Sequence, residues 1–301
     1  MRRPSVCATY GLGLAEQRAL DALVEDVLDS RLDPEGAPLY AHGWELAARL
    51  PDGLRKALYE FRVTGTEAAL LVRGLYVDDP ALGRPPAAGT RRESVYLALT
   101  AMGLAEVFSR GGPLVRDVPA PDASEPDASE PDASEGDAGV ELGTADGAGP
   151  GRGDYLGLLA LAPATITVAA LGDVPLAASR AGLLRRSRFR LTGRPGPVLH
   201  EDHAEPSLRL DPFRATADAT DPQAAAALGA LRDGLRRAAV PIALDAGDVL
   251  LVDNFRALTG QRAGRLRRVL LARDLRRLGP RRTDLSVRVL TSPENVSDER
   301  P

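Results

Sequence analysis

The hydrophobic pattern changes along the chain from helical spacing to short apolar runs. Between residues 14 and 32, apolar positions recur at helical spacing with acids between them, which predicts an amphipathic helix. The same spacing predicts helices at 45–50, 54–61 and 93–108, and compact apolar runs predict strands at 68–75 and 113–118. The first third of the chain is therefore expected to be mainly helical.

Short apolar runs dominate the second half of the chain. Helices are predicted there near 174–185 and over 222–239, where Asp221 is suited to cap the N-terminus. Helices followed by many short strands indicate an α+β fold in which helices flank a β-sandwich or a jelly roll. The predicted strands are 156–161, 165–171, 189–191, 207–210, 242–244, 249–253 and 266–273.

A repeated acidic segment separates these two parts. PDASEPDASEPDASE spans residues 121–135 as three copies of one pentapeptide, with acids and prolines and no basic residue. Such a composition buries too little apolar surface to fold, so a disordered insert is expected from 119 to 151. The jelly-roll domain is then divided into 1–118, with the helices and first strands, and 152–290. A flexible polar tail is expected at 291–301.

Composition narrows the classes of function. The net charge of −4 offers no basic field to nucleic acid, and the single cysteine, Cys7, excludes a disulfide framework. The N-terminus lacks the apolar stretch of a signal peptide, and the longest apolar run, 155–170, is broken by Pro163. We therefore expect a cytoplasmic protein that binds neither nucleic acid nor a membrane.

Four stretches of the chain can be compared with a known family. They are LPDGLRKALYEFRVTGTEAALLVRGL, RGDYLGLLALAPATITVAAL, PVLHEDHAEPSLRLDP and GDVLLVDNFRALTGQRAGRLRRVLLARDL. In this order they resemble the clavaminate synthase-like oxygenases of the TauD-like superfamily, nearest to the arginine and other amino-acid β-hydroxylases. Those proteins are iron(II)/2-oxoglutarate dioxygenases. The resemblance covers most of residues 50–290 and implies a double-stranded β-helix, a cupin-like jelly roll.

The resemblance also implies an iron site made of two histidines and one carboxylate, which leaves positions open for 2-oxoglutarate and oxygen. In the family the first His and the carboxylate lie in a run such as LEFHTED, just before R-x-D-Y. RGDY at 152–155 fixes that register here, so Gly143 replaces the His and Ala145 replaces the carboxylate. The distal His follows VDNFR, where this chain has Thr259. All three ligands are absent, so neither a metal nor a cofactor is expected.

Other positions of these motifs keep polar side chains. Thr144 and Asp146 still match the family. Counting back from Arg268 places the family's 2-oxoglutarate-binding arginine on Gly264, beside Arg265, because the preceding loop is shorter here. Arg268 itself aligns with an arginine that the arginine hydroxylases use on their substrate. The candidate ligand-binding residues are Arg268, Arg265, Thr144 and Asp146, and no catalytic residue is assigned.

Two further clusters each allow two interpretations. His200 and His203 could hold a metal ion, but their spacing is one residue shorter than in a helical zinc motif, and nearby prolines favour a solvated hairpin. Clustered arginines could bind an anion or nucleic acid, but a strand with outward-facing arginines is simpler, and few aromatic residues are present for base stacking. These arginines stand at 262, 265, 267, 268, 273, 276, 277, 281 and 282.

The sequence therefore predicts a pseudo-oxygenase that has kept the fold and lost the iron triad. Its expected role is the non-oxidative binding of a small amino-acid-like molecule, or of a biosynthetic partner protein, in amino-acid-derived specialised metabolism. One alternative is an enzyme with iron-independent, non-redox chemistry in the old pocket, where Arg268, Asp253 or Asp146 would act. The other is an active amino-acid hydroxylase with unusual iron ligands.

Overall fold

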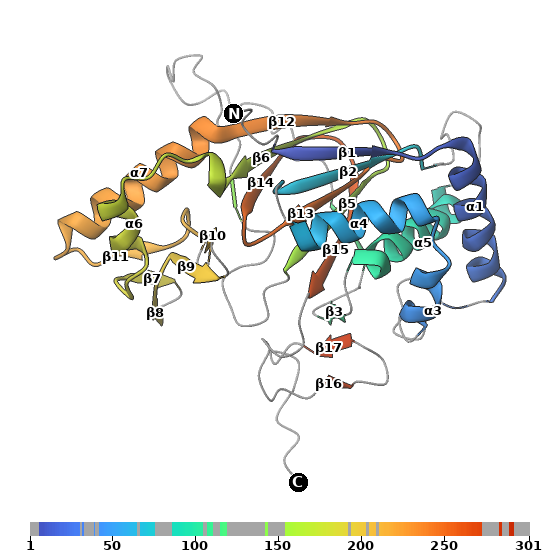
Figure 1. Ribbon diagram of the computed structural model, residues 1–301, viewed down its shortest axis with the longest axis horizontal. Helices are drawn as coiled ribbons and strands as arrows, with labels where there is room; N and C mark the ends of the chain where they lie inside the picture. Colours follow the sequence, from blue (N-terminus) through green and yellow to red (C-terminus); the bar gives the residue numbers. More distant parts are fainter. Residues whose placement is uncertain are drawn as a thin grey trace, which may run out of the picture.

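Two β-sheets face each other at the centre of the molecule, shown in the computed structural model of Figure 1. The structure describes residues 6–30, 32, 39, 42–64, 67–75, 86–104, 107–110, 115–118, 142–143, 154–191, 194–202, 205–208, 211–272, 283–284 and 289–291. Apolar side chains from both sheets pack against each other in the space between them, among them Leu158, Leu250, Ile166 and Val168. This is the jelly-roll arrangement that the strand pattern and the resemblance predicted.

The larger sheet has nine strands in the order β1-β2-β13-β5-β15-β3-β17-β16, with β4 also paired to β15. β1 runs parallel to β2 and β17 parallel to β3, whereas the other pairs are antiparallel. Its strands are β1 (Cys7–Gly11), β2 (Ala69–Arg73), β3 (Val107–Arg110), β4 (Val115–Val118), β5 (Tyr155–Ala160), β13 (Val249–Asp253), β15 (Leu266–Ala272), β16 (Thr283–Asp284) and β17 (Val289–Thr291).

The smaller sheet has the order β12-β6-β14, and both of its pairs are antiparallel. The strands are β6 (Ala164–Ala170), β12 (Ala239–Leu244) and β14 (Ala257–Ala263). A single bridge between Gly143 and Thr259 adds one more segment beside β14. β14 therefore lies between β6 and the segment that contains Gly143, inside the sheet rather than at its edge.

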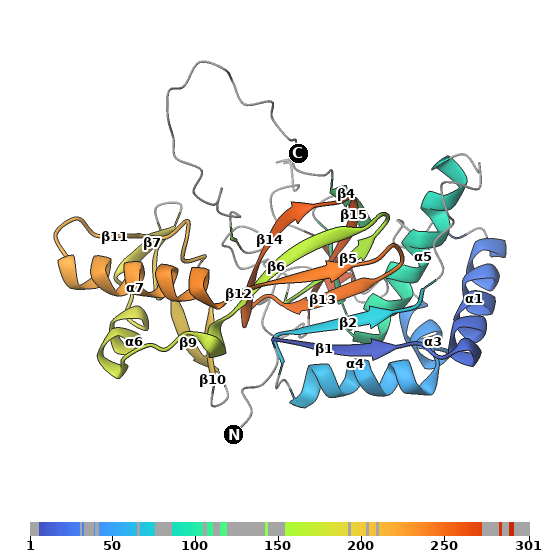
Figure 2. The same cartoon turned by 90° about the horizontal axis from the view of Figure 1, so that it is seen from above.

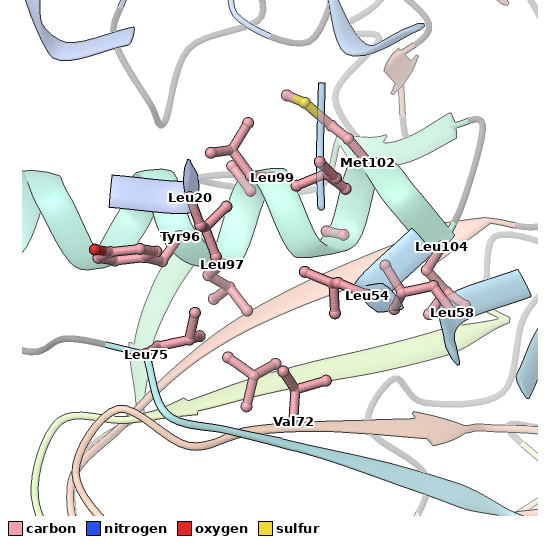
Figure 3. Packing of buried hydrophobic residues seen from close by; sticks show 14 of the residues in the cluster. Leu20, Leu54, Leu58, Val72, Leu75, Tyr96, Leu97, Leu99, Met102 and Leu104 are labelled. Atoms are coloured by element: carbon pink, nitrogen blue, oxygen red, sulfur yellow. The ribbon is translucent and has the colours of Figure 1, made fainter. Parts of the chain in front are cut away.

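In the described part of the chain, α4 and α5 lie on the outer face of the larger sheet, and α1 and α3 pack against α5 (Figure 1). The bounds of these helices are α1 (Leu14–Asp29), α3 (Gly43–Ala48), α4 (Asp52–Thr64) and α5 (Pro86–Leu104). Figure 3 shows how Leu97 and Leu99 of α5 pack among leucines of α1 and α4 and above Val72 of β2. Burial of such side chains at about 25 cal/mol per Å² is the main force that holds these helices on the sheet.

A second group of elements covers the outer face of the smaller sheet, at the opposite end of the molecule (Figure 2). Asp221 caps α7, because its side chain accepts a hydrogen bond of 2.9 Å from the amide of Ala224, which confirms the predicted cap. The elements are η2 (Leu171–Asp173), α6 (Ala178–Leu184), α7 (Pro222–Ala238), β7 (Phe189–Leu191), β8 (Arg194–Gly196), β9 (Leu199–Asp202), β10 (Glu205–Leu208) and β11 (Thr216–Ala217).

Some local predictions were wrong. The helix expected at 93–108 starts at Pro86 and ends at Leu104, and Phe108 belongs to β3. β1 and β14 were not predicted as strands, because CATYG and ALTGQRA contain glycine and polar residues that weaken the strand pattern. Both are held by pairing with strands distant in sequence.

The domain boundaries drawn from the sequence remain predictions. Within the expected insert at 119–151, the structure describes only Leu142 and Gly143, and both have defined packing or pairing. The ordered core therefore includes these two residues. Among the described residues, no helix combines the length and the hydropathy needed to cross a membrane.

Cys7 should react slowly with thiol reagents in the folded protein. Its side chain is half-buried in β1, and burial raises the pKa of its thiol from 9.0 to about 11. The thiolate is the reactive form, so alkylation by iodoacetamide at pH 8 should be about 100-fold slower than in the guanidinium-unfolded protein. Mass spectrometry of the single cysteine measures both rates. Equal rates would contradict the burial of Cys7 in the pairing of β1 with β2.

Candidate functional site

Two motifs that were separate in the sequence meet at one end of the central strands. β13 and β5 are antiparallel, and their register places Asp253 opposite Tyr155. One residue further on, the amide of Asn254 donates a hydrogen bond of 2.8 Å to the carbonyl of Asp154. The RGDY and VDNFR motifs therefore contact each other, and both contribute to positioning the smaller sheet.

The VDNFR motif forms the turn by which the chain passes from the larger sheet into the smaller one. The Asp253 Oδ1 atom accepts a hydrogen bond of 3.0 Å from the amide of Phe255, and the Asp253 carbonyl accepts one of 3.0 Å from the amide of Arg256. The Phe255 carbonyl accepts a further bond of 2.7 Å from the amide of Leu208. The buried Asp253 carboxylate is thus engaged in holding this turn, which fixes where β14 begins.

Gly143 and Thr259, which occupy two of the three expected iron-ligand positions, lie directly opposite each other. Each amide donates a hydrogen bond of 3.0 Å to the other residue's carbonyl. The neighbouring Leu142 and Leu258 point outward into the apolar cluster under α7, whereas Ala257 packs between the sheets. Since side chains alternate along a strand, positions 143 and 259 both face the interior between the sheets.

The side chains at these positions do not fit an iron site. Gly143 has no side chain, and Thr259 offers only a neutral hydroxyl, whereas iron(II) sites of this type use imidazole and carboxylate. Ala145, at the third position, carries a methyl group and lies outside the described residues. Within the described part of the chain, no three His, Cys, Asp or Glu side chains are grouped so as to hold a metal ion.

The expected 2-oxoglutarate arginine position is closed to any side chain. Gly264 lies in the turn between β14 and β15 with a φ of +99°. A Cβ atom there would lie 2.3 Å from the Ala164 Cβ atom and 2.8 Å from the Pro163 carbonyl oxygen. The adjacent Arg265 is exposed, and its carbonyl accepts the amide of Leu161. Neither position 264 nor position 265 therefore places an arginine side chain in the interior.

Arg267 and Arg268 point to opposite faces of β15. Leu266 and Leu270 pack between the sheets, so Arg268, which shares their face, is directed into the interior and is half-buried. Arg267 points the other way, under α5, where it donates a hydrogen bond to the Ser94 hydroxyl. Arg267 thus faces outward from the sheet, as the simpler interpretation expected, but it is only 3% exposed. The cause is that α5 covers the outer face of this sheet.

A buried carboxylate that was not predicted lies beside Gly143. Asp211 is fully buried, and its Oδ2 atom is 3.4 Å from the place where a Cβ atom on Gly143 would lie. Its Oδ1 atom accepts a hydrogen bond of 2.9 Å from the amide of Phe213. The sequence signal was an aspartate directly after the apolar run SLRL, but the contact with Gly143 spans 68 positions and is invisible locally.

Of the remaining candidates, only some lie within the described residues. β9 and β10 form the antiparallel hairpin expected for LHEDHAEPSL, and His200 is exposed opposite Ser207. His203, Thr144 and Asp146 lie outside the described residues, as do the arginines from 273 to 282. The hairpin agrees with the favoured interpretation of this segment. The alternative of a metal site at His200 and His203 stays untested, because His203 is outside the described residues.

The architecture and the motif positions match known oxygenases. No protein-family model matches the chain. It is 28% identical to the enduracididine beta-hydroxylase of Streptomyces hygroscopicus, covering 90% of this chain and 96% of the relative. It also superimposes on the non-heme iron oxygenase OrfP in complex with Fe, succinate and (3S)-hydroxy-L-Arg, with a TM-score of 0.78 and 27% identity over 94% of this chain and 99% of OrfP. In sequence and fold the chain is therefore similar to amino-acid hydroxylases and non-heme iron oxygenases of the clavaminate synthase-like type.

OrfP has also been solved with Fe and alpha-ketoglutaric acid, at a TM-score of 0.75 and 26% identity over 94% of this chain and 99% of OrfP. The fold of OrfP is thus shared over nearly the whole chain. The iron and 2-oxoglutarate groups are expected from the sequence at positions 143, 145, 259 and 264, which carry Gly, Ala, Thr and Gly here.

Replacing Gly264 by alanine should destabilise the protein. A residue with a side chain in the left-handed region costs about 1–2 kcal/mol, and the contacts with Ala164 and Pro163 add to this. The matched control is Gly229→Ala in α7, where the added Cβ atom meets open space and should raise the free energy of unfolding by roughly 0.5–1 kcal/mol. Urea denaturation measures both. A Gly264→Ala protein as stable as wild type would contradict the described turn.

Proposed function

We propose that this chain is a non-oxidative pseudo-oxygenase, which uses the fold of the clavaminate synthase-like family to bind a small, cationic amino acid without iron. The observation that carries the proposal is the pairing of Gly143 with Thr259. Two ligand positions lie side by side and face the interior, yet neither supplies a donor that iron(II) prefers.

The losses are independent of one another, which strengthens the proposal. Gly143 and Thr259 come from segments more than a hundred residues apart, and Ala145 removes the carboxylate. Gly264 adds a change in the backbone, because its turn leaves no space for the side chain of a 2-oxoglutarate-binding arginine. A single misaligned position would not account for all four differences.

The charges that face the interior suggest the chemistry of the ligand. Asp211 offers a buried carboxylate beside Gly143, and Arg268 offers a guanidinium on the inner face of β15. A molecule with a cationic side chain and a carboxylate would complement both. OrfP has been solved with L-Arg, a molecule of this class. L-arginine is therefore the probe for this chain. The proposed role belongs to amino-acid-derived metabolism, and the alternative to a small ligand is a biosynthetic partner protein.

The fully buried Asp211 is better placed for binding than for proton transfer, because one oxygen is already engaged by the Phe213 amide. Asp253 is similarly engaged in the turn before β14. Thr259 could donate a hydrogen bond from its hydroxyl to an anionic group of a ligand. These arrangements favour binding over the alternative of new acid–base chemistry in the old pocket.

An anaerobic titration with iron(II) and 2-oxoglutarate tests the loss of iron. We expect no heat of binding by calorimetry and no visible charge-transfer band, because the donor atoms are absent. OrfP, measured in parallel, is the positive control. A band from this chain would establish an active hydroxylase with unusual ligands and would overturn the proposal.

Replacing Asp211 by asparagine should weaken the binding of L-arginine. The asparagine oxygen can still accept the Phe213 amide, so the turn is kept while the charge is removed. A hydrogen bond to a charged group contributes about 1.5–3 kcal/mol, which predicts a loss of affinity of about 10- to 100-fold.

L-citrulline, which has nearly the same shape and no cationic charge, should bind weakly to wild type and be little affected by this change. Asp52→Asn on α4 is the control, because its exposed carboxylate lies on a helix at the outer face of the larger sheet. Calorimetry measures all combinations. Equal affinity of wild type for L-arginine and L-citrulline would exclude Asp211 as the cation-binding residue.

A further inference from the structure

Helix α7 contacts the turn that carries Asp211 through an arginine. The Arg232 Nε atom donates a hydrogen bond of 2.7 Å to the Pro212 carbonyl, and its Nη2 atom donates one of 2.7 Å to the Ala215 carbonyl. Pro212 directly follows Asp211, and Ala215 ends the turn. One planar guanidinium thus binds both sides of the same short loop, a geometry that lysine cannot reproduce.

The turn is also closed by its own hydrogen bonds. The amide of Ala215 donates to the Asp211 carbonyl at 2.8 Å, and the amide of Phe213 donates to the Asp211 Oδ1 atom at 2.9 Å. The first bond places the backbone of Asp211, and the second sets the orientation of its carboxylate. The other carboxylate oxygen, Oδ2, lies 3.4 Å from the place where a Cβ atom on Gly143 would be.

The side chains of Arg232 and Asp211 also interact electrostatically. Burial lowers the pKa of Arg232, the nearby Arg236 lowers it further, and the negative charge of Asp211 opposes both effects. Taking a guanidinium partly out of water is unfavourable unless its donors find acceptors, and here two of them donate to backbone carbonyls. Arg236 differs in its contact, because it lies over the ring of Phe213 at 5.1 Å.

We infer that Arg232 is a positioning residue, which holds the 211–215 turn so that the Asp211 carboxylate faces the interior beside Gly143 and selects a cationic ligand. This inference rests on the proposed function. Arg232 would not touch the ligand itself and would act only through the turn and Asp211. Its effect should therefore appear in the choice between charged and neutral ligands.

A simpler role for Arg232 is to fasten α7 to the rest of the protein. In that case Arg232→Lys would lower thermal stability and weaken L-arginine and L-citrulline equally. If Arg232 positions Asp211, the variant should instead lower the ratio of the two affinities by about 10-fold, the lower limit expected for losing Asp211 itself. Arg232→Lys added to Asp211→Asn should then cause little further change in the ratio.

Calorimetry with both ligands is the first arm of the experiment, with Arg236→Lys as the matched control on the same helix. The control touches the ring of Phe213 and not the carbonyls of the turn, so it should keep the affinity ratio of wild type. A ratio unchanged in Arg232→Lys, or full additivity in the double variant, would overturn the inference.

Amide hydrogen exchange is the second arm and needs no ligand. The Phe213 amide reports the bond to the Asp211 carboxylate, and the Ala215 amide reports the closure of the turn. Both should exchange at least about 10-fold faster in Arg232→Lys and at the wild-type rate in Arg236→Lys. If wild type does not bind L-arginine, the proposed function fails. Unchanged exchange of the Phe213 amide in Arg232→Lys would separately overturn the positioning role.

Discussion

The candidate site depends on the hydrogen-bonded turn from Asp253 to Arg256. This turn takes the chain from β13 of the larger sheet to β14 of the smaller one, and its length sets which residues of β14 face the interior. The Leu208 amide ties the β9–β10 hairpin to the same turn. Thr259, Gly143 and, beyond the hairpin, Asp211 are thereby brought to one place from three distant segments. A shift of one residue in β14 would turn Thr259 outward and bring Leu258 into the interior.

The residues that pack the core of this fold are different from those at the expected iron-ligand positions. Three apolar clusters hold the helices and sheets together. Gly143 and Thr259, the two expected iron-ligand positions within the described residues, pair with each other and belong to none of these clusters. The hydrophobic terms that stabilise the fold therefore do not depend on which side chains stand at positions 143 and 259. This is consistent with an architecture that matches the oxygenase OrfP over nearly the full length of the chain at 27% identity.

Local signals predicted the parts of the structure that depend on neighbouring residues. Most of the helices and buried strands and the Asp221 cap follow from periodicity and capping preference. Arg268 was named as a candidate only through the family resemblance, as were the motif positions of Gly143 and Thr259, and the inward direction of Arg268 became visible only in the structure. Features that depend on distant segments were missed. β14 is stabilised by β6 and not by its own propensity, and Arg267 is buried only because α5 crosses the outer face of its strand. Asp211 acquires its environment from Gly143 and from Arg232, neither of which is near it in sequence.

The turn at Gly264 limits which side chains the backbone can carry there. Histidine or glutamate at positions 143, 145 and 259 would each need only a substitution of one residue. An arginine at 264 would not fit, because the backbone there has a positive φ and lies against the 163–164 segment. A side chain that reaches the interior from this point would need inserted residues that lengthen the loop. Side chains elsewhere in the site can change position by position, whereas this turn can change only together with the length of the loop.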